Sequence, residues 1–446
     1  MENNFIIRGD LCWSEGLTAL KTMPDAYLVC VDGKSAGTFP RIPEQYEKLP
    51  LIDHSGSLVI PGLVDLHTHA PQFAFRGLGM DLELLEWLST NAFPEEAKYS
   101  DPAYARKAYS AVVEHLKSGS NTRSVFFATL HVPATMILMD LLEESGMVSM
   151  VGKVNMDRNS PDTLREENAA ASINATREWL EKCAAANYRN TKPILTPRFI
   201  PSCSNELMRG LCALQREFNL PVQSHLSENR GEIEWVRELC PSSESYGSAY
   251  NDFGLFGSEG SEPAAPTVMA HCVWSDEKEI ELMARRGVFA AHCPQSNTNL
   301  ASGIAPMRHI LEAGVPAGLG SDVAGGTSSS IFRAMTDAIQ VSKLRRALLG
   351  VKDKPLTMEE VFFLGTKGGG EFFAKSNMGQ CGSFEQGYEL DAIVLDDKAL
   401  TCPLELSVRD RLERAIYICD SRNIEAKYIR GSELLLARSG LKFRPD

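Results

Sequence analysis

Eight short apolar segments alternate with amphipathic stretches through the middle of this chain, and this alternation limits the folds open to it. Each segment ends in polar residues, whereas the stretches between them have the spacing of helices with one apolar face. Strands that alternate with helices predict βα units and a parallel sheet. Eight such units predict an α/β fold, a TIM-type (β/α)8 barrel. The predicted strands are GLVDLHTHA, RSVFFATLH, MVSMVGKVNMD, KPILTPRF, LPVQSHLSE, TVMAHCVW, GVFAAHCPQSN and VPAGLGSDVAGG.

One helix between these strands has clear signals at both of its ends. In SDEKEIELMARRG, Ser275 is the expected N-cap and acidic residues fill the first turn. Arg285 and Arg286 occupy the last turn, and Gly287 is expected to end the helix. By contrast, the loop over residues 242–266 is rich in Gly, Ser and Glu and is predicted to be irregular.

The two ends of the chain differ from the middle because they consist of short strands and turns. NFIIRG and AYLVCV are strand-like near the N-terminus, with a hairpin turn at Asp32-Gly33. LDAIVLDD and AKYIRGSELLL have the same character near the C-terminus. We therefore expect a small composite β-sandwich domain built from both termini. The predicted boundaries are 1–61 and 381–446 for this small domain and 62–380 for the barrel, which together account for the 446 residues.

Composition excludes several classes of protein. The net charge of −13 argues against binding to nucleic acid or to an anionic membrane, both of which favour a basic surface. No apolar run is long enough for a membrane span, and the N-terminus lacks the pattern of a secretory signal. The 11 cysteines include no CxxC pair and are expected to be free thiols. We expect a cytoplasmic protein.

Metal-ligating residue types gather at the predicted carboxyl ends of the strands. In the stretch PGLVDLHTHAPQ, the two histidines stand two positions apart, so both side chains project from one face of a strand. In a TIM barrel all eight strand ends face one mouth, where catalytic groups lie. The residues expected there are His67 and His69 after strand one, His225 after strand five, His271 after strand six, His292 after strand seven and Asp322 after strand eight, with His131 after strand two as a further candidate.

Imidazole and carboxylate ligands together suit Zn²⁺ or Fe²⁺, and a catalytic site leaves one position open for water. Such a site also needs a base for the proton of the water and an acid for the leaving group. Asp322 is a candidate for both ligand and base. Glu228 follows His225 by three residues and can reach the same mouth, where it would donate a proton to a ring nitrogen. The alternative for Glu228 is a carboxylate in the first turn of a helix.

These motifs resemble those of the amidohydrolase superfamily. PGLVDLHTH is similar to its first-strand signature, GSDVAGG to its eighth-strand segment, and GSFEQGYELDAIVLD to the return into its small β domain. Within the superfamily the chain closely resembles the guanine deaminases, and the resemblance covers essentially the whole chain. The more specific blocks are HTHAPQFAFRGLGMDLELLEWL, TPRFIPSCS, VQSHLSENRGEIEWV, VMAHCVWS, AAHCPQSNTNLASG and GLGSDVAGG.

The resemblance implies hydrolytic deamination of guanine to xanthine and ammonia by a homodimeric enzyme of purine catabolism. It implies that His271 lies near the hydrolytic water, that Glu228 carries a proton to the purine ring, and that Asp322 accepts the proton of the water. An arginine only donates and so suits a carbonyl oxygen, glutamine both donates and accepts, and phenylalanine packs on a flat ring. One Zn²⁺, or alternatively Fe²⁺, would be held by His67, His69, His225 and Asp322, and the purine would be contacted by His69, Gln72, Arg198, Phe199, His225, Glu228 and Asp322.

Four other interpretations make different predictions. A related aminohydrolase would act on another purine, a pyrimidine or a triazine ring. A two-metal hydantoinase-like enzyme would need a carboxylated lysine at the end of strand four, but Lys192 lies at the beginning of that strand. A silent relative would serve only in assembly, although every expected ligand is present here. The HxE…PCxxC type of zinc deaminase is disfavoured because the chain has no PCxxC.

Two further features of the sequence are left open at this stage. Arg123 stands in the second strand where a small residue is expected from the resemblance, and it could alter the surroundings of the site. The segment LELLEWL, from Leu82 to Leu88, is predicted to be a helix that either serves the fold alone or covers the pocket.

Overall fold

The computed structural model describes residues 3–258 and 265–436, and the strands of its middle part form two parallel four-stranded sheets. All eight predicted strands are present, although strands three and four are each divided in two. The divided parts β8 (Val154–Asn155) and β10 (Thr196–Pro197) pair with each other. The first sheet contains β5 (Leu63–His69), β6 (Asn121–Phe127), β7 (Val148–Gly152) and β9 (Thr191–Pro193), and the second contains β11 (Val222–Leu226), β12 (Thr267–His271), β13 (Phe289–His292) and β14 (Ala317–Leu319).

Main-chain hydrogen bonds join the two sheets at both seams. At one seam Leu195 forms a parallel bridge with Val222. At the other, the N–H of Asp322 donates to the carbonyl of His67 at 2.8 Å, and the N–H of His69 donates to the carbonyl of Val323 at 3.0 Å. The first and eighth predicted strands therefore lie side by side at their carboxyl ends.

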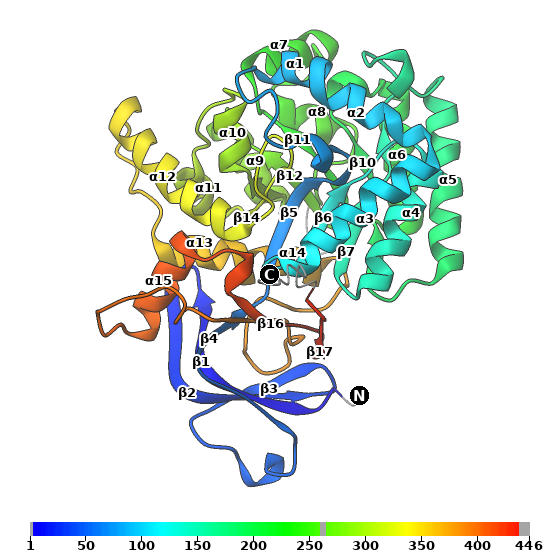
Figure 1. Cartoon of the computed structure of the whole chain (residues 1–446). Coiled ribbons are helices and arrows are strands. Elements are labelled where there is room, and N and C mark those ends of the chain that lie inside the picture. The colour runs from blue at the N-terminus through cyan, green and yellow to red at the C-terminus, as the bar shows by residue number, and fades with distance from the viewer. Residues whose placement is uncertain (1–2, 259–264, 437–446) are drawn as a thin grey trace, which may run out of the picture.

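Helices surround these strands (Figure 1). In α6, for example, the buried residues Leu207, Met208, Leu211, Leu214 and Gln215 recur at three- and four-residue spacing, as a helix packed on a sheet requires. The longer helices are α3 (Pro102–Ser118), α4 (Val132–Ser145), α5 (Ala169–Ala186), α6 (Asn205–Phe218), α7 (Arg230–Leu239), α9 (Glu277–Arg286), α12 (Ile331–Leu349) and α15 (Val408–Ile418). The shorter ones are α1 (Leu84–Trp87), α2 (Phe93–Ala97), α8 (Tyr246–Asp252), α10 (Pro294–Asn299), α11 (Met307–Glu312), α13 (Met358–Phe363) and α14 (Gly369–Lys375).

Two details of the predicted helices and loops need correction. The N-cap of α9 is Asp276 and not Ser275, because the Asp276 carboxylate accepts from the N–H of Glu279. The C-terminal end agrees with the prediction, with Gly287 in a left-handed conformation. The segment 242–266 is not wholly irregular, since it contains α8. Residues 259–264 of that segment lie outside the described residues.

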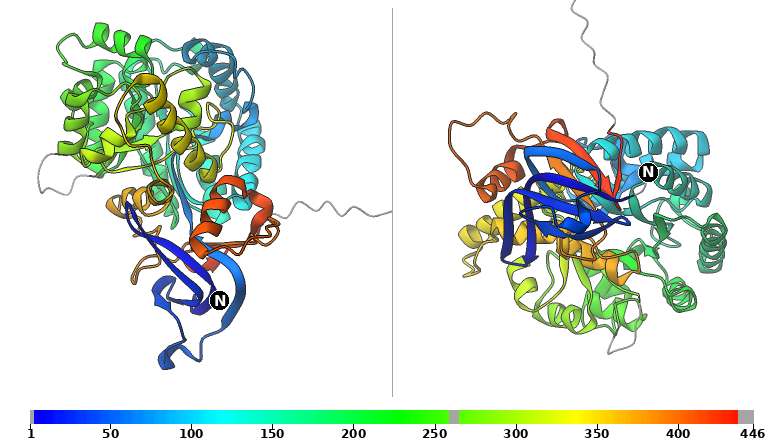
Figure 2. Two further views of the ribbon diagram at one scale, coloured as in Figure 1. Left: turned by 90° about the vertical axis from the view of Figure 1, so that its left-hand side faces the viewer. Right: turned by 90° about the horizontal axis from the view of Figure 1, so that it is seen from below.

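Strands from both ends of the chain form one seven-stranded sheet next to the helix-covered part (Figures 1 and 2). Strands β4 and β15 pair antiparallel and so join the N-terminal and C-terminal segments. The predicted turn at Asp32-Gly33 connects β2 to β3, with both residues in the left-handed region. The strand order is β17 (Ser432–Glu433), β16 (Ile424–Ile429), β15 (Ala392–Leu395), β4 (Leu51–Pro61), β1 (Phe5–Gly16), β2 (Ala19–Val31) and β3 (Lys34–Phe39).

Arg123 connects the terminal sheet to the parallel strands, far from the carboxyl ends where the site lies. Its side chain is fully buried and donates to Asp391 and to Glu389, each at 2.6 Å, and to the carbonyl of Met378 at 2.9 Å. Burial opposes the charge, but the Asp391 and Glu389 carboxylates raise the pKa of the guanidinium above its usual value. The concern that Arg123 alters the site is therefore wrong, because this arginine joins two parts of the fold.

We expect Arg123→Met to lower the free energy of unfolding by about 3–5 kcal/mol, because it leaves the buried Asp391 carboxylate without its counterion, whereas Glu389 keeps its ion pair with Arg430. Chemical denaturation followed by tryptophan fluorescence measures the change. Arg177→Met is the matched control, since Arg177 forms a two-pronged pair with Glu217 on the surface and should cost less than about 1 kcal/mol. Equal losses in the two variants would contradict this assignment.

All 11 cysteines are free thiols, as the sequence predicts, and nine of them are buried. Within residues 3–258 and 265–436, none of the helices has the length and apolar character needed to cross a bilayer.

Candidate functional site

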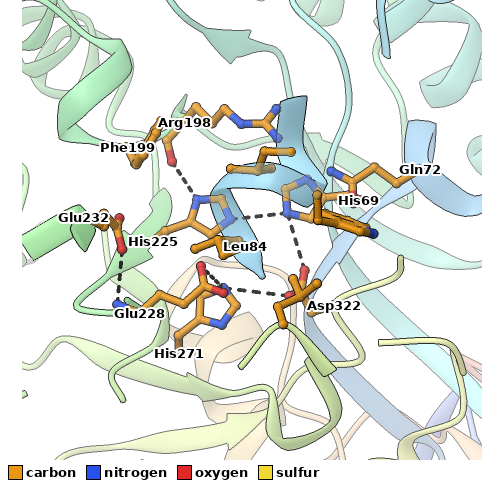
Figure 3. A pocket seen from close by; sticks show the side chains of 13 residues that line it. His69, Gln72, Leu84, Arg198, Phe199, His225, Glu228, Glu232, His271 and Asp322 are labelled. Carbon is orange, nitrogen blue, oxygen red and sulfur yellow. Dashed lines mark hydrogen bonds and ion pairs between the residues drawn. The ribbon is translucent and has the colours of Figure 1, made fainter. Parts of the chain in front are cut away.

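The carboxyl ends of the parallel strands bring four histidines and one aspartate together in a buried cluster. Figure 3 shows His69, His225, His271 and Asp322 of this cluster. The Nε2 atom of His67 lies 3.2 Å from Oδ1 of Asp322, and Nε2 of His69 lies 3.5 Å from the same oxygen. The Nε2 atoms of His69 and His225 are 3.3 Å apart. Two overlapping groups have ligand atoms within 4.8 Å of one another: His67, His225 and His271, and His67, His69 and Asp322.

The hydrogen bonds of the outer ring nitrogens orient two of these imidazoles. Nδ1 of His225 donates to the carbonyl of Arg198 at 2.6 Å, and Nδ1 of His271 pairs with Oδ1 of Asn297 at 2.8 Å. When the outer nitrogen carries the proton, the inner Nε2 presents a lone pair to the centre of the cluster. Among the described residues, the buried Nε2 atoms of His67 and His271 have no hydrogen-bond partner.

Burial keeps the ligand histidines neutral. It lowers the pKa of His67 below the usual value and lowers those of His69 and His225 far below it. Burial alone would raise the pKa of Asp322, but the facing imidazoles, His67 first, hold it well below its usual range. Neutral imidazoles and an ionised carboxylate are the protonation states that a divalent cation requires of its ligands. The donor set therefore fits a Zn²⁺ or Fe²⁺ ion.

Asp65 fixes the strand that carries the two paired histidines. Its carboxylate accepts from the N–H of His67 at 3.2 Å and from the N–H and hydroxyl of Ser321 at 3.0 and 2.5 Å. Ser321 directly precedes Asp322, so one buried carboxylate connects the first and the last contributors to the cluster. Burial raises the pKa of Asp65 to about 7.

Glu228 lies beside the cluster and is buried. Its Oε2 is 3.4 Å from Nε2 of His271, and its Oε1 accepts from the hydroxyl of Ser302 at 3.2 Å. Burial, with neighbouring carboxylates, raises the pKa of Glu228 to about 7. Burial opposes a charge on His271, but Glu228 and Asp322 outweigh it and raise the pKa of His271.

The helix that follows does not contain Glu228. The N-cap of α7 is Asn229, so the alternative that Glu228 is a carboxylate of the first helical turn is wrong. Glu232 occupies the N3 position and its Oε2 accepts from the N–H groups of Glu228 and Asn229 at 3.3 and 3.4 Å. Tyr246 donates to the other oxygen of Glu232 at 2.6 Å, so the backbone of Glu228 is held by a buried carboxylate that is itself fixed.

Three residues at the strand ends have left-handed backbone conformations. The φ angles are 47° for Ser227, 75° for His271 and 44° for Asp322. Residues other than glycine adopt this region at a cost, and such residues concentrate at functional sites. The conformation turns the chain sharply after each strand and leaves the His271 and Asp322 side chains facing the cluster (Figure 3).

A cavity next to the cluster is lined by the three residues expected to contact the purine, Gln72, Arg198 and Phe199. All three are buried, so Arg198 is not the surface ion pair that is the usual setting of an arginine. The Gln72 amide, the Arg198 guanidinium and the Phe199 ring thus share one cavity with five residues of the cluster and its surroundings. These are His69, His225, Glu228, His271 and Asp322.

The segment predicted as a helix after strand one also lines this cavity. Leu84, Trp87 and Leu88 contribute apolar side chains from α1 and from the single π-helical turn that continues it. Figure 3 shows Leu84 among the side chains that line the cavity. Of the two alternatives left open, the structure therefore supports a segment that covers the pocket.

Two histidines predicted at the same mouth do not join the cluster. His292 is buried at the end of β13, but it is in neither ligand group and does not line the cavity. His131 precedes α4 and lines a different cavity, with Glu166 and Tyr99. Strand-end position alone therefore predicts too many ligands, because it does not fix the direction in which each side chain points where the strand ends.

Sequence reasoning missed several supporting residues, among them Asp65, Glu232 and Asn297. Glu232 follows Asn229 by three positions, and this capping-box spacing is a signal that the sequence contains. Asn297 has no such signal, because only the turn after β13 brings it against His271.

Comparisons with known proteins identify the family of this chain. The model of the amidohydrolase family matches residues 58–433. This chain belongs to the amidohydrolase family. Guanine deaminase of Dictyostelium discoideum is one relative, 37% identical over 87% of this chain and 85% of the relative.

Two other relatives of this amidohydrolase are informative. Human guanine deaminase is 37% identical over 84% of this chain and 82% of the relative. Among solved structures, the guanine deaminase of C. acetobutylicum with bound guanine in the active site has a TM-score of 0.92 and 44% identity. That comparison covers 97% of this chain and 100% of the other.

Proposed function

We propose that this amidohydrolase is a guanine deaminase, a hydrolase of cyclic amidine carbon–nitrogen bonds that converts guanine and water into xanthine and ammonia. One observation supports this most: a single buried cavity combines a metal-type ligand cluster, a carboxyl group beside it, and the polar and aromatic groups that suit a purine. The resemblance to guanine deaminases over most of the chain supports the same substrate.

His67, His69, His225 and Asp322 would hold one Zn²⁺ per chain, with Fe²⁺ as the alternative. The convergence of their ligand atoms and the neutral state of the three buried imidazoles support this assignment. A bound divalent ion would lower the pKa of a water molecule and so make a nucleophile available near neutral pH.

The proton transfers fall to residues around the cluster. Asp322, held ionised, accepts the proton of the attacking water. Glu228 delivers a proton to the ring nitrogen next to the amino-bearing carbon, and its raised pKa of about 7 suits a group that both gives and takes protons near neutrality. His271 faces both carboxyl groups and orients the water. A second proton transfer to the amino group allows ammonia to leave.

Gln72, Arg198 and Phe199, which line the cavity, would recognise the base. Arg198 donates to the carbonyl oxygen of guanine, Gln72 contacts the polar edge, and Phe199 packs against the ring. His69, His225, Glu228 and Asp322 approach the reacting carbon from the other side. Leu84, Trp87 and Leu88 exclude water above the substrate, which strengthens each of these polar interactions.

We also propose a closed barrel and a small domain built from both ends of the chain. The two parallel sheets, joined at both seams, are halves of one (β/α)8 barrel over residues 62–380. Residues 1–61 and 381–446 form the small domain, for which the sandwich arrangement stays a prediction because its described strands form one sheet. We further propose a cytoplasmic homodimer that acts in purine catabolism and binds neither nucleic acid nor membrane.

Metal analysis combined with a substrate panel tests the function. Purified protein should contain about one Zn²⁺ or Fe²⁺ per chain and should convert guanine, with much slower turnover of adenine, cytosine and 8-oxoguanine, as followed by ultraviolet absorbance. A metal-loaded protein that leaves guanine unchanged would refute the proposal. Faster turnover of another ring would instead indicate one of the related aminohydrolases.

A further inference from the structure

A buried glutamate outside the cavity lining binds two of the side chains that contact the substrate. Glu96 lies in α2 and is only 1% exposed. Its Oε1 accepts from Nε2 of Gln72 at 2.8 Å and from one terminal nitrogen of Arg198 at 3.1 Å. Its Oε2 accepts from the other terminal nitrogen of Arg198 at 2.6 Å. One carboxylate therefore holds the glutamine and the guanidinium fork together.

This contact determines which hydrogen-bonding group Gln72 presents. A carboxylate only accepts, so the amide nitrogen of Gln72 must face Glu96. The amide oxygen then faces the opposite way, where it accepts from the N–H of Ala324 at 3.1 Å. The N–H of Ala324 favours the same orientation, so a donor on one side and the Glu96 carboxylate on the other fix the Gln72 amide together.

The same contact makes the burial of Arg198 possible. A buried guanidinium without a counterion is costly, and the paired geometry leaves its remaining N–H groups free to donate. The guanidinium carbon also lies 5.1 Å from the ring centre of Phe93, three residues before Glu96. Two contacts from α2 thus restrict the position of Arg198.

We propose that Glu96 is a positioning residue for substrate recognition, which sets the orientation of Gln72 and Arg198 through its carboxylate. This inference rests on the proposed function. Glu96 also belongs to the continuous segment of α1, the π-helical turn and α2 that carries Leu84 and Trp87 over the cavity. The Glu96 carboxylate therefore connects this segment, which lines the cavity, to Gln72 and Arg198.

Glu95 provides a matched control on the same helix. It is also a buried glutamate, but it bonds Lys98 at 2.6 Å and the hydroxyl of Tyr104, and it contacts neither Gln72 nor Arg198 among the described residues. The experiment compares wild type, Glu96→Gln, Glu95→Gln, Arg198→Met and the double variant Glu96→Gln/Arg198→Met. For each protein, kcat and KM on guanine are measured with metal content and melting temperature.

We expect Glu96→Gln to lower kcat/KM by about 100-fold, mainly through KM, with metal retained, because misplaced recognition groups lose orientation. Glu95→Gln should stay within about threefold of wild type. In the Arg198→Met background, adding Glu96→Gln should lower kcat/KM by far less than 100-fold, because Arg198, one of the two side chains that Glu96 positions, is already absent. If Glu96 served only the stability of the fold, Glu96→Gln would lower melting temperature and activity together. The activity loss of the double variant would then equal the product of the losses in Glu96→Gln and Arg198→Met.

A change of less than about threefold in Glu96→Gln, or fully multiplicative losses in the double variant, would overturn the role of Glu96. If Glu96→Gln does not fold, Glu96→Asp takes its place: it keeps the charge but shortens the reach, and full activity would equally overturn the inference. A wild type that leaves guanine unchanged would instead refute the proposed function, so the two failures are distinct.

Discussion

Asp322→Asn is expected to lower kcat on guanine by about 10⁴-fold and to reduce the bound metal well below one ion per chain. The substitution removes the carboxylate that we propose as the one anionic metal ligand and as the base for the attacking water. Its carboxylate lies within 4 Å of three imidazoles, so several contacts change at once. Steady-state kinetics and elemental analysis of the purified variant measure the two effects.

Asp337→Asn is the control for loss of a buried aspartate. Asp337 is also buried, pairs with Arg333 in α12 and does not line the cavity. It should keep its metal and most of its activity. Near-normal turnover in Asp322→Asn would contradict the assignment of Asp322, whatever the metal content.

Glu228→Gln is expected to lower kcat by about 10³-fold while the metal content stays at the wild-type level. The amide keeps the size of the side chain and cannot carry a proton between water and the ring. Metal retention distinguishes Glu228→Gln from Asp322→Asn, because the carboxylate of Glu228 is in neither group of possible metal ligands.

Glu360→Gln tests whether loss of any buried glutamate has the same result. Glu360 caps α13 and pairs with Arg308, outside the cavity. Its activity should stay close to that of wild type even if its stability falls. Full guanine turnover in Glu228→Gln with bound metal would show that another group carries the proton, although the substrate would still be guanine.

The order of strands and helices was predictable because it follows from local patterns. Apolar runs ending in polar residues located all eight strands, and the turn at Asp32-Gly33 and the end of α9 at Gly287 followed from residue conformations. The errors were also local. Ser275 and Asp276 are both good N-caps, and only the exact start of α9 decides between them.

The candidate ligands were predictable for a different reason. Parallel strand ends meet at one edge, so residues far apart in sequence could be grouped before any distance was known. This rule cannot exclude His292 or His131, because it does not say which way each side chain turns after the strand. The left-handed backbone of His271 and Asp322 is what aims these two at the centre.

The sequence by itself determined the βα alternation, the residue types at the strand ends and the family resemblance, because these depend on spacing along the chain. Only the tertiary structure decided which groups support those residues. No sequence pattern marks Glu96, and Arg123 stands where the family resemblance predicts a small residue. Their partners lie 102 and 268 residues away, in Arg198 and Asp391. Spacing along one chain carries no information about such pairs, since burial and the folding of distant segments create them.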